Sequence, residues 1–140
     1  MDSCVFCDIV ARKKFGKIIF ENETTMAFLS NKPDATAHIL VITKEHFANL
    51  NDVNIEKYIE LQKTLLLIND HLINNCDYTG ANILMASGKS AGQSIEHIHY
   101  HLIPRNVDDG INAWPVLSNR KHETSDELYQ KLKITSKSNF

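Results

Sequence analysis

Residues 93–104 read Gln-Ser-Ile-Glu-His-Ile-His-Tyr-His-Leu-Ile-Pro, with a histidine at every second position from 97 to 101. Successive side chains of a strand point to opposite faces, so His97, His99 and His101 would share one face and the apolar residues between them would enter the core. On a helix the same histidines would spread around the axis. The pattern therefore predicts a strand that presents three imidazoles as one polar ridge.

A ridge of three histidines has three explanations. It could be purely structural, it could bind a metal, or it could act as nucleophile and acid/base pair at a phosphorus or acyl centre. The segment before it, residues 87–94, is rich in Gly and Ser, and its backbone N–H groups could hold an anion. This segment lacks the lysine placement of a Walker loop. An anion cradle beside imidazoles favours phosphate chemistry.

Length and composition limit the class of protein. A chain of 140 residues predicts one domain over residues 1–140. The formal net charge of −2 gives no broad basic surface for nucleic acid. No apolar run approaches the roughly 20 residues of a membrane span, and residues 1–4 do not resemble a signal peptide. We expect a cytoplasmic protein that binds neither nucleic acid nor membrane.

The remaining chain alternates short apolar runs with turn residues, and one long amphipathic segment interrupts them. The long helix is expected to begin at a cap on Asn51 or Asp52 and to reach about Asn75. Strands are expected at residues 18–20, 25–29, 38–42 and 80–86 and in the ridge, and short helices at residues 4–14, 44–50 and 127–132, the last opened by a capping box of Thr124 and Glu127. Residues 104–140 form a C-terminal tail that carries this last helix. The fold class is α+β, with a mainly antiparallel sheet of about five strands.

Cys4 and Cys7 form a C-x-x-C pair, whereas Cys76 stands alone after the long helix. Three cysteines cannot form a closed set of disulfides, and a reducing cytosol opposes disulfides in any case. The pair therefore points to metal or redox chemistry.

Three blocks together resemble the histidine triad (HIT) family. The ridge follows the pattern His-φ-His-φ-His-φ-φ, where φ is apolar; the other blocks are Cys4-Val-Phe-Cys7 and the stretch from His38 to His46. The likeness extends from Cys4 to about Arg105. It implies a HIT-like fold and a nucleotide hydrolase or transferase that acts at an α-phosphate.

The resemblance also implies individual roles. The middle histidine, His99, would be the nucleophile and would carry a transient nucleotidyl group. His101 would hold phosphate oxygens or the bridging atom. Gln93 and Ser94 would face the leaving group, and His38 would support the nucleophile from a neighbouring strand.

By the same resemblance, Val5, Phe6 and Ile9 would cover the base, and Ser30 and Asn31 would meet the ribose. The sequence departs from the family pattern at Ser30, where many members have an acidic residue, and at Ala86, where Asn or Gln is common. The chain also resembles bacterial-type relatives that bind zinc. Its ligands would be Cys4, Cys7, His46 and His97, a Cys₂His₂ set typical of structural zinc.

The function expected from the resemblance is hydrolysis of a nucleoside phosphoramidate or a dinucleoside polyphosphate, such as diadenosine tetraphosphate, with a purine nucleotide as the bound part. Nucleotidyl transfer ranks lower, because transferase branches often have Gln where this chain has His101. The alternatives are a nucleotide-binding scaffold with little turnover, which Ser30 and Ala86 motivate, and a metal-dependent hydrolase with the ridge as its ligand set. The resemblance also implies a homodimer that pairs through the long helix and an adjoining strand.

Overall fold

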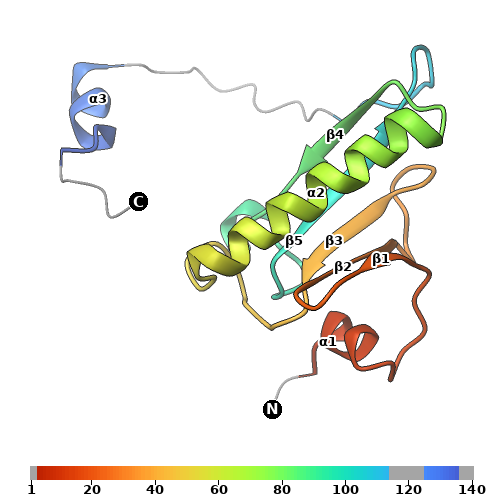
Figure 1. The fold of residues 1–140 in the computed structure, drawn as a ribbon. Coiled ribbons are helices and arrows are strands. Elements are labelled where there is room, and N and C mark those ends of the chain that lie inside the picture. The colour runs from red at the N-terminus through yellow and green to blue at the C-terminus, as the bar shows by residue number, and fades with distance from the viewer. Residues whose placement is uncertain (1–2, 114–124, 136–140) are drawn as a thin grey trace.

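The computed structural model describes residues 3–113 and 125–135. Figure 1 shows one sheet with a long helix across it. The elements in chain order are α1 (Val5–Val10), β1 (Ile18–Glu21), β2 (Thr25–Leu29), β3 (Ile39–Thr43), α2 (Ile55–Asn75), β4 (Gly80–Leu84), a 3₁₀ turn (Lys89–Ala91), β5 (His99–Arg105) and α3 (Asp126–Leu132). None of the described helices has both the length and the apolar character needed to cross a membrane.

The five strands form one sheet in the order β1-β2-β3-β5-β4, and every neighbouring pair is antiparallel. The predicted α+β fold with a mainly antiparallel sheet is confirmed. Because β5 lies between β3 and β4, the histidines of β5 sit inside the sheet rather than at its edge. His101 is paired with Leu40 of β3 and Leu84 of β4, and His99 is paired with Ile42 of β3, so ladder pairing fixes the backbone that carries their side chains.

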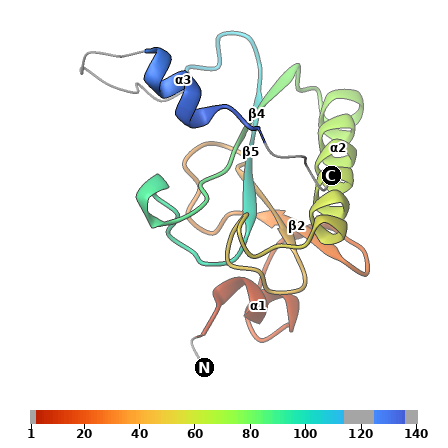
Figure 2. The ribbon, with the colours of Figure 1, turned by 90° about the vertical axis from the view of Figure 1, so that its left-hand side faces the viewer.

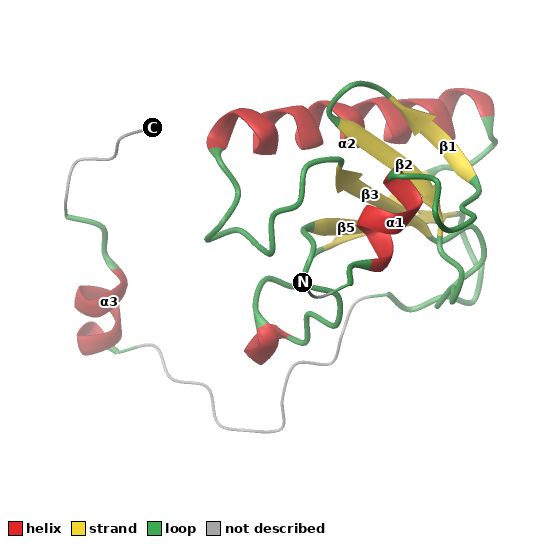
Figure 3. Ribbon diagram, turned by 90° about the horizontal axis from the view of Figure 1, so that it is seen from below, coloured by secondary structure: helices red, strands yellow, loops and turns green. Residues whose placement is uncertain are grey.

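Each face of the sheet has its own apolar core. On one face, α2 packs Leu61, Leu65 and Ile68 against β3 and β5, including Leu102. On the other face, α1 packs Phe6 and its neighbours against β2 and β3. Figures 2 and 3 show α2 and α1 in these separate positions. The alternation predicted for the ridge is present, because the buried Ile98 and Leu102 face α2 while the histidines face the side of α1.

The ridge itself is not a strand throughout. β5 begins at His99, so His97 lies just before it, in a segment where Ile98 N–H donates to the carbonyl of Phe47. Residues 44–50 form bends and irregular structure, with a turn only at residue 50, in place of the predicted short helical turn. The two segments support each other through backbone contacts distant in sequence.

Helix boundaries differ from the predictions in three places. α1 covers only Val5–Val10 of the predicted 4–14, with the Cys4 side chain as its N-cap. α2 ends at Asn75 as predicted, but its N-cap is Asn54, whose side chain accepts a hydrogen bond from the N–H of Lys57. α3 begins at Asp126 after the N-cap Ser125. The predicted cap Thr124 lies outside the described residues.

Candidate functional site

His99 is held in one tautomer by its own strand. Its Nδ1 lies 2.7 Å from the carbonyl oxygen of His97, so Nδ1–H is the donor and the Nε2 nitrogen keeps its lone pair. The side chain is 5% exposed. Burial lowers the pKa of His99 below its ordinary value of 6.5, which keeps the imidazole neutral at pH 7. A buried, neutral imidazole with a free Nε2 lone pair can act as a nucleophile.

His38 and His101 form a relay that ends in a hydrogen-bond donor. The backbone N–H of Asp34 donates to Nδ1 of His38 over 3.1 Å, so the proton of a neutral His38 is on Nε2. That Nε2–H donates to Nδ1 of His101 over 2.8 Å. His101 therefore carries its proton on Nε2. The site combines an acceptor nitrogen on His99 with a donor nitrogen on His101.

His38 was expected to support the nucleophile, and that role stays a prediction. The hydrogen bond of its Nε2 is to His101. Burial lowers the pKa of His38 and, together with the neighbouring His99 and His38, lowers the pKa of His101 to about 4. All three imidazoles are neutral at pH 7.

The predicted metal ligands come together. One ligand atom from each of Cys4, Cys7, His46 and His97 lies within 4.8 Å of the others, and no other group of this kind is found in the described residues. Cys4 Sγ is 3.4 Å and Cys7 Sγ 3.6 Å from Nδ1 of His97. Cys7 Sγ is 3.3 Å from Nδ1 of His46. A tetrahedral zinc with bonds of about 2.0–2.3 Å has ligand separations close to these values.

The hydrogen bonds of His97 also fit a metal. Its Nε2–H donates to the carbonyl oxygen of Thr43 over 2.7 Å, which leaves the Nδ1 lone pair facing the two sulfurs. Burial lowers the pKa of His97 to about 4, so this nitrogen is unprotonated. Burial, and after it the side chain of Cys4, raises the pKa of Cys7 to about 11. A zinc ion would displace that proton, because the thiolate is its ligand form. The residues fit zinc in both composition and spacing.

Only one histidine of the ridge belongs to this cluster. His99 and His101 instead point their Nδ1 atoms to a carbonyl and to His38, respectively. The ridge is therefore divided between His97, which belongs to a cluster that could hold a metal, and His99 and His101, which do not belong to it.

All five residues predicted to contact the nucleoside line one cavity of about 230 Å³, which we call the base cavity. Ligand pockets for drug-sized molecules span roughly 300–1,000 Å³, so this cavity suits one ring system and not a whole nucleotide. Four lining residues were not predicted from the sequence: Phe28, Lys32, Leu40 and Ile95. Two of these, Phe28 and Leu40, are paired across strands β2 and β3. The full lining is Val5, Phe6, Ile9, Phe28, Ser30, Asn31, Lys32, Leu40 and Ile95.

Phe6 connects the base cavity to His99. Its ring lines the cavity and also packs edge-on against His99, with ring centroids 5.1 Å apart. A base in the cavity would thus lie one aromatic ring away from His99.

Gln93 and Ser94 differ in their surroundings. The Gln93 side chain is buried, and all its hydrogen bonds are to backbone atoms: it accepts from the N–H of Gly88 and donates to the carbonyls of Ala48 and Ile95. These bonds brace the loop, and the contact of Gln93 with a leaving group stays a prediction. Ser94 is exposed and lines a cavity of about 440 Å³ with Cys4 and His46.

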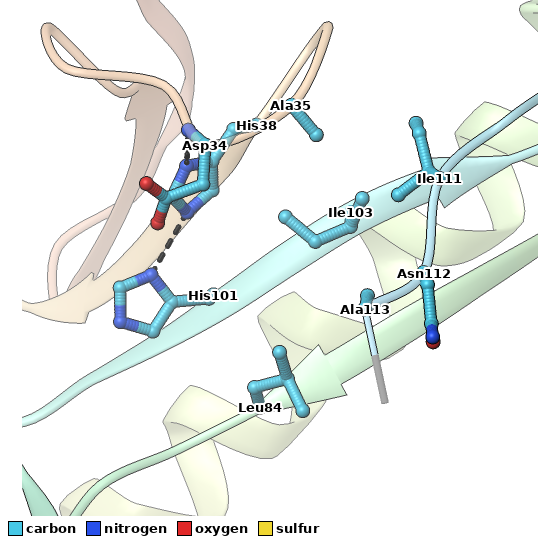
Figure 4. Close-up of a pocket in the computed structure, with 9 residues that line it drawn as sticks. All are labelled: Asp34, Ala35, His38, Leu84, His101, Ile103, Ile111, Asn112 and Ala113. Carbon is cyan, nitrogen blue, oxygen red and sulfur yellow. Dashed lines mark hydrogen bonds between the residues drawn. The ribbon is translucent and has the colours of Figure 1, made fainter. Parts of the chain in front are cut away.

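A further cavity of about 340 Å³ lies beyond His101, and we call it the Asp34 cavity (Figure 4). Asp34 and its role in orienting His38 were missed, because a backbone donor in a loop has no sequence signal. The lining residues are Asp34, Ala35, His38, Leu84, His101, Ile103, Ile111, Asn112 and Ala113.

Comparisons with known proteins agree with this geometry. The HIT domain family model matches residues 12–108. Adenosine 5′-monophosphoramidase HNT1 of Candida albicans is 30% identical over 139 residues, covering 94% of this chain and 90% of the relative. A zinc-bound histidine triad family protein from Mycobacterium smegmatis is 32% identical, with a TM-score of 0.73 over 79% of this chain and 81% of its own. A HIT family protein from Bacillus anthracis is 30% identical, with a TM-score of 0.78 over 93% of this chain and 92% of its own.

Proposed function

This chain belongs to the HIT family, and we propose that it is a hydrolase that releases a nucleoside monophosphate from a nucleoside phosphoramidate or a dinucleoside polyphosphate. The observation that carries this proposal is the shared position of Phe6, whose ring both lines the base cavity and packs against His99. A purine in the cavity would bring its own α-phosphate to the histidines. The name of the Candida relative supports a phosphoramidate as the substrate.

The reaction follows from the two tautomers. The Nε2 lone pair of His99 attacks the α-phosphorus, a P–N(His) bond forms, and the bond to the leaving group breaks. The leaving atom takes that bonding pair and a proton, which the exposed Ser94 hydroxyl is proposed to relay from solvent. The Nε2–H of His101 donates to a phosphoryl oxygen and stabilises the charge that develops there. Water then attacks phosphorus and gives one proton to solvent, while the P–N(His) bond breaks and its electron pair returns to Nε2 of His99.

Zinc would have a structural role in this scheme. The four ligands would hold a structural zinc, which when bound would link α1 to the segment before β5. Cys4 and Cys7 belong to the start of α1, the helix that also contributes Phe6 and Ile9 to the base cavity. His97 supplies the carbonyl that orients His99. A metal bound by the four ligands would thereby fix the position of the base cavity relative to His99. Free thiols in such a site suit a cytoplasmic location.

We also infer a homodimer that pairs through α2 and the edge strand β4. Ile59, Leu66 and Ile73 recur at seven-residue spacing on α2 and are 46%, 70% and 37% exposed. Ile83 on the neighbouring edge strand is 43% exposed. Apolar side chains in such a stripe lose contact with water if a second copy covers them.

Turnover assays test the proposed function. The wild type should hydrolyse a fluorogenic adenosine phosphoramidate or diadenosine tetraphosphate, and His99→Ala should lower kcat/KM at least about 1,000-fold, because the nucleophile is lost. His71→Ala is the matched control, since His71 is an exposed residue of α2. Equal, negligible rates for wild type and His99→Ala on both substrates would instead indicate a nucleotide-binding protein without turnover.

A further inference from the structure

The cluster of Cys4, Cys7, His46 and His97 is open to solvent on one side. His97 is buried, but the two cysteines are half-buried and His46 is exposed. Cys4 and His46 also line the cavity of about 440 Å³ at Ser94, which we call the Cys4 cavity. A water molecule occupies about 30 Å³ of the liquid, so this cavity has room for a small solute such as hydrogen peroxide. Cys4 is therefore within reach of reagents dissolved in water.

The sulfurs of Cys4 and Cys7 lie side by side. The N–H of Cys7 donates to Cys4 Sγ over 3.5 Å, which holds the Cys4 side chain against the first turn of α1. Both sulfurs lie beside the same nitrogen, Nδ1 of His97, at 3.4 Å and 3.6 Å. The C-x-x-C spacing is that of dithiols that open and close a disulfide. A rotation of the two side chains would bring the sulfurs into bonding distance.

The two thiols of the pair differ in access. Cys4 lines the Cys4 cavity, whereas Cys7 does not. The third cysteine, Cys76, packs against the core on the α2 face of the sheet, while Cys4 packs against the core on the α1 face. A disulfide within the chain therefore has Cys4 and Cys7 as its neighbouring partners, and Cys4 is the sulfur that meets an oxidant first.

The Cys4 cavity and the base cavity share a wall. Val5 and Ile95 line both cavities. Phe6 lies between the two cysteines in the chain, and its ring packs edge-on against that of His97 at a centroid distance of 5.7 Å, as it does against that of His99. A change at the cysteines therefore acts on residues that shape the base cavity.

We propose that Cys4 and Cys7 are a hydroperoxide-reactive pair, and that their oxidation to a disulfide releases the metal and weakens nucleotide binding in the base cavity. Two sulfurs joined to each other are no longer thiolates, the form that binds zinc, so His46 and His97 alone would remain as ligands. α1 then loses its link to the segment before β5. The oxidation itself is independent of the hydrolase function proposed above, and its effect on a bound nucleotide rests on that proposal.

The reaction with hydrogen peroxide takes two steps. The Cys4 thiolate attacks one peroxide oxygen, an S–O bond forms, the O–O bond breaks and hydroxide leaves, so that Cys4 becomes a sulfenic acid. The Cys7 thiolate then attacks the Cys4 sulfur, the S–S bond forms, and the S–O bond breaks with loss of a second hydroxide. The sulfurs lose two electrons and peroxide gains them. A dithiol reductant reverses the change.

The test uses the full chain loaded with zinc, with Cys76→Ser in every protein so that no third thiol reacts. Hydrogen peroxide is added at a few equivalents, and a chromogenic chelator measures the zinc released. Most of the zinc should be released, and the peptide that contains both cysteines should lose two hydrogens by mass. The dissociation constant for AMP should rise about ten-fold, within the usual range of coupling between two sites. Dithiothreitol with added zinc should restore both properties.

Variants of the pair identify the first sulfur and control for damage elsewhere. Cys7→Ser should accumulate a sulfenic acid on Cys4 that dimedone traps. Cys4→Ser should be labelled at Cys7 much more slowly, because Cys7 does not line the Cys4 cavity. In the variant with both serines, peroxide should leave the affinity for AMP unchanged.

The outcomes separate this inference from the hydrolase function. A protein that binds no zinc, or that keeps its zinc and both free thiols in peroxide, would refute the reactive pair. A disulfide form with unchanged affinity for AMP, or an equal effect of peroxide on the variant with both serines, would refute the link to the base cavity. Equal labelling of the two single variants would refute Cys4 as the first sulfur. Release of zinc and loss of AMP affinity in a protein that turns over no substrate would refute the hydrolase function alone.

Discussion

At the scale of single residues, the site depends on where four protons sit. Backbone groups fix the tautomer of three imidazoles. The carbonyl of His97 accepts from His99, and the N–H of Asp34 donates to His38. The carbonyl of Thr43 accepts from His97. The fourth follows, because His38 then donates to His101. An imidazole left without these partners would populate both tautomers, and only one of them suits each role.

Substitution of His38 tests this relay. His38→Phe removes the donor to His101 Nδ1, so His101 loses its fixed tautomer, and we expect kcat/KM to fall about ten- to one hundred-fold, the range seen when an orienting partner of a functional histidine is lost. His38→Gln should recover much of the loss, because a Gln amide can donate the same hydrogen bond. Equal losses in both variants would indicate that His38 matters only for packing.

The pH dependence tests the neutral state of the imidazoles. Protonation of His99 removes its lone pair, so activity is lost as pH falls through its pKa. Burial lowers that pKa below 6.5 and the pKa of His101 to about 4. The acid limb of kcat/KM against pH should therefore have its midpoint below 6.5. A midpoint at or above 6.5 would show that His99 is not held neutral by burial.

At the scale of elements, α1 is six residues long and depends on its tertiary contacts. Isolated helices of this length are unstable in water. Phe6 and Ile9 are buried against β2 and β3, and Cys4 and Cys7 place the start of the helix beside His97. Metal binding would therefore stabilise an element that also forms a wall of the base cavity.

Removal of one ligand tests this link. Cys7→Ser should reduce zinc content from near one per chain to well below it, and the loss of a ligand that binds only the folded state should lower Tm by about 10 °C. The dissociation constant for AMP should rise, because α1 shapes the base cavity. Cys76→Ser is the matched control, since Cys76 lies at the end of α2, outside the cluster. Unchanged zinc content in Cys7→Ser, measured by elemental analysis, would contradict the assigned ligand set.

At the scale of the whole molecule, the parts that were predictable from sequence are those with local causes. The period of two around His99 predicted the strand and its faces, and the C-x-x-C pair pointed to metal or redox chemistry, whereas the ligand set with His46 and His97 came from the family resemblance. Contacts between distant segments were not predictable. The hydrogen bond from His38 to His101, the backbone contacts of Gln93 and the irregular structure of residues 44–50 all depend on how loops meet in three dimensions.

The exposed stripe on α2 is also a property of the whole molecule. Leu66→Glu should weaken a dimer about 100-fold or more, because association would bury two unpaired charges. Sedimentation velocity across a concentration series would measure this. Phe15→Glu is the matched control, since Phe15 is 79% exposed but lies in the segment between α1 and β1. A wild type that is monomeric at all concentrations would contradict the proposed interface.

The central claim is that His99 carries the nucleotide during turnover. It is tested most directly by mixing the enzyme with an adenosine phosphoramidate, quenching at alkaline pH within one turnover and mapping the modified peptide by mass spectrometry. The account predicts one adenylyl group on the peptide that contains His99, formed and lost at rates that match turnover. Steady turnover with no adduct, or an adduct on another residue, would contradict it.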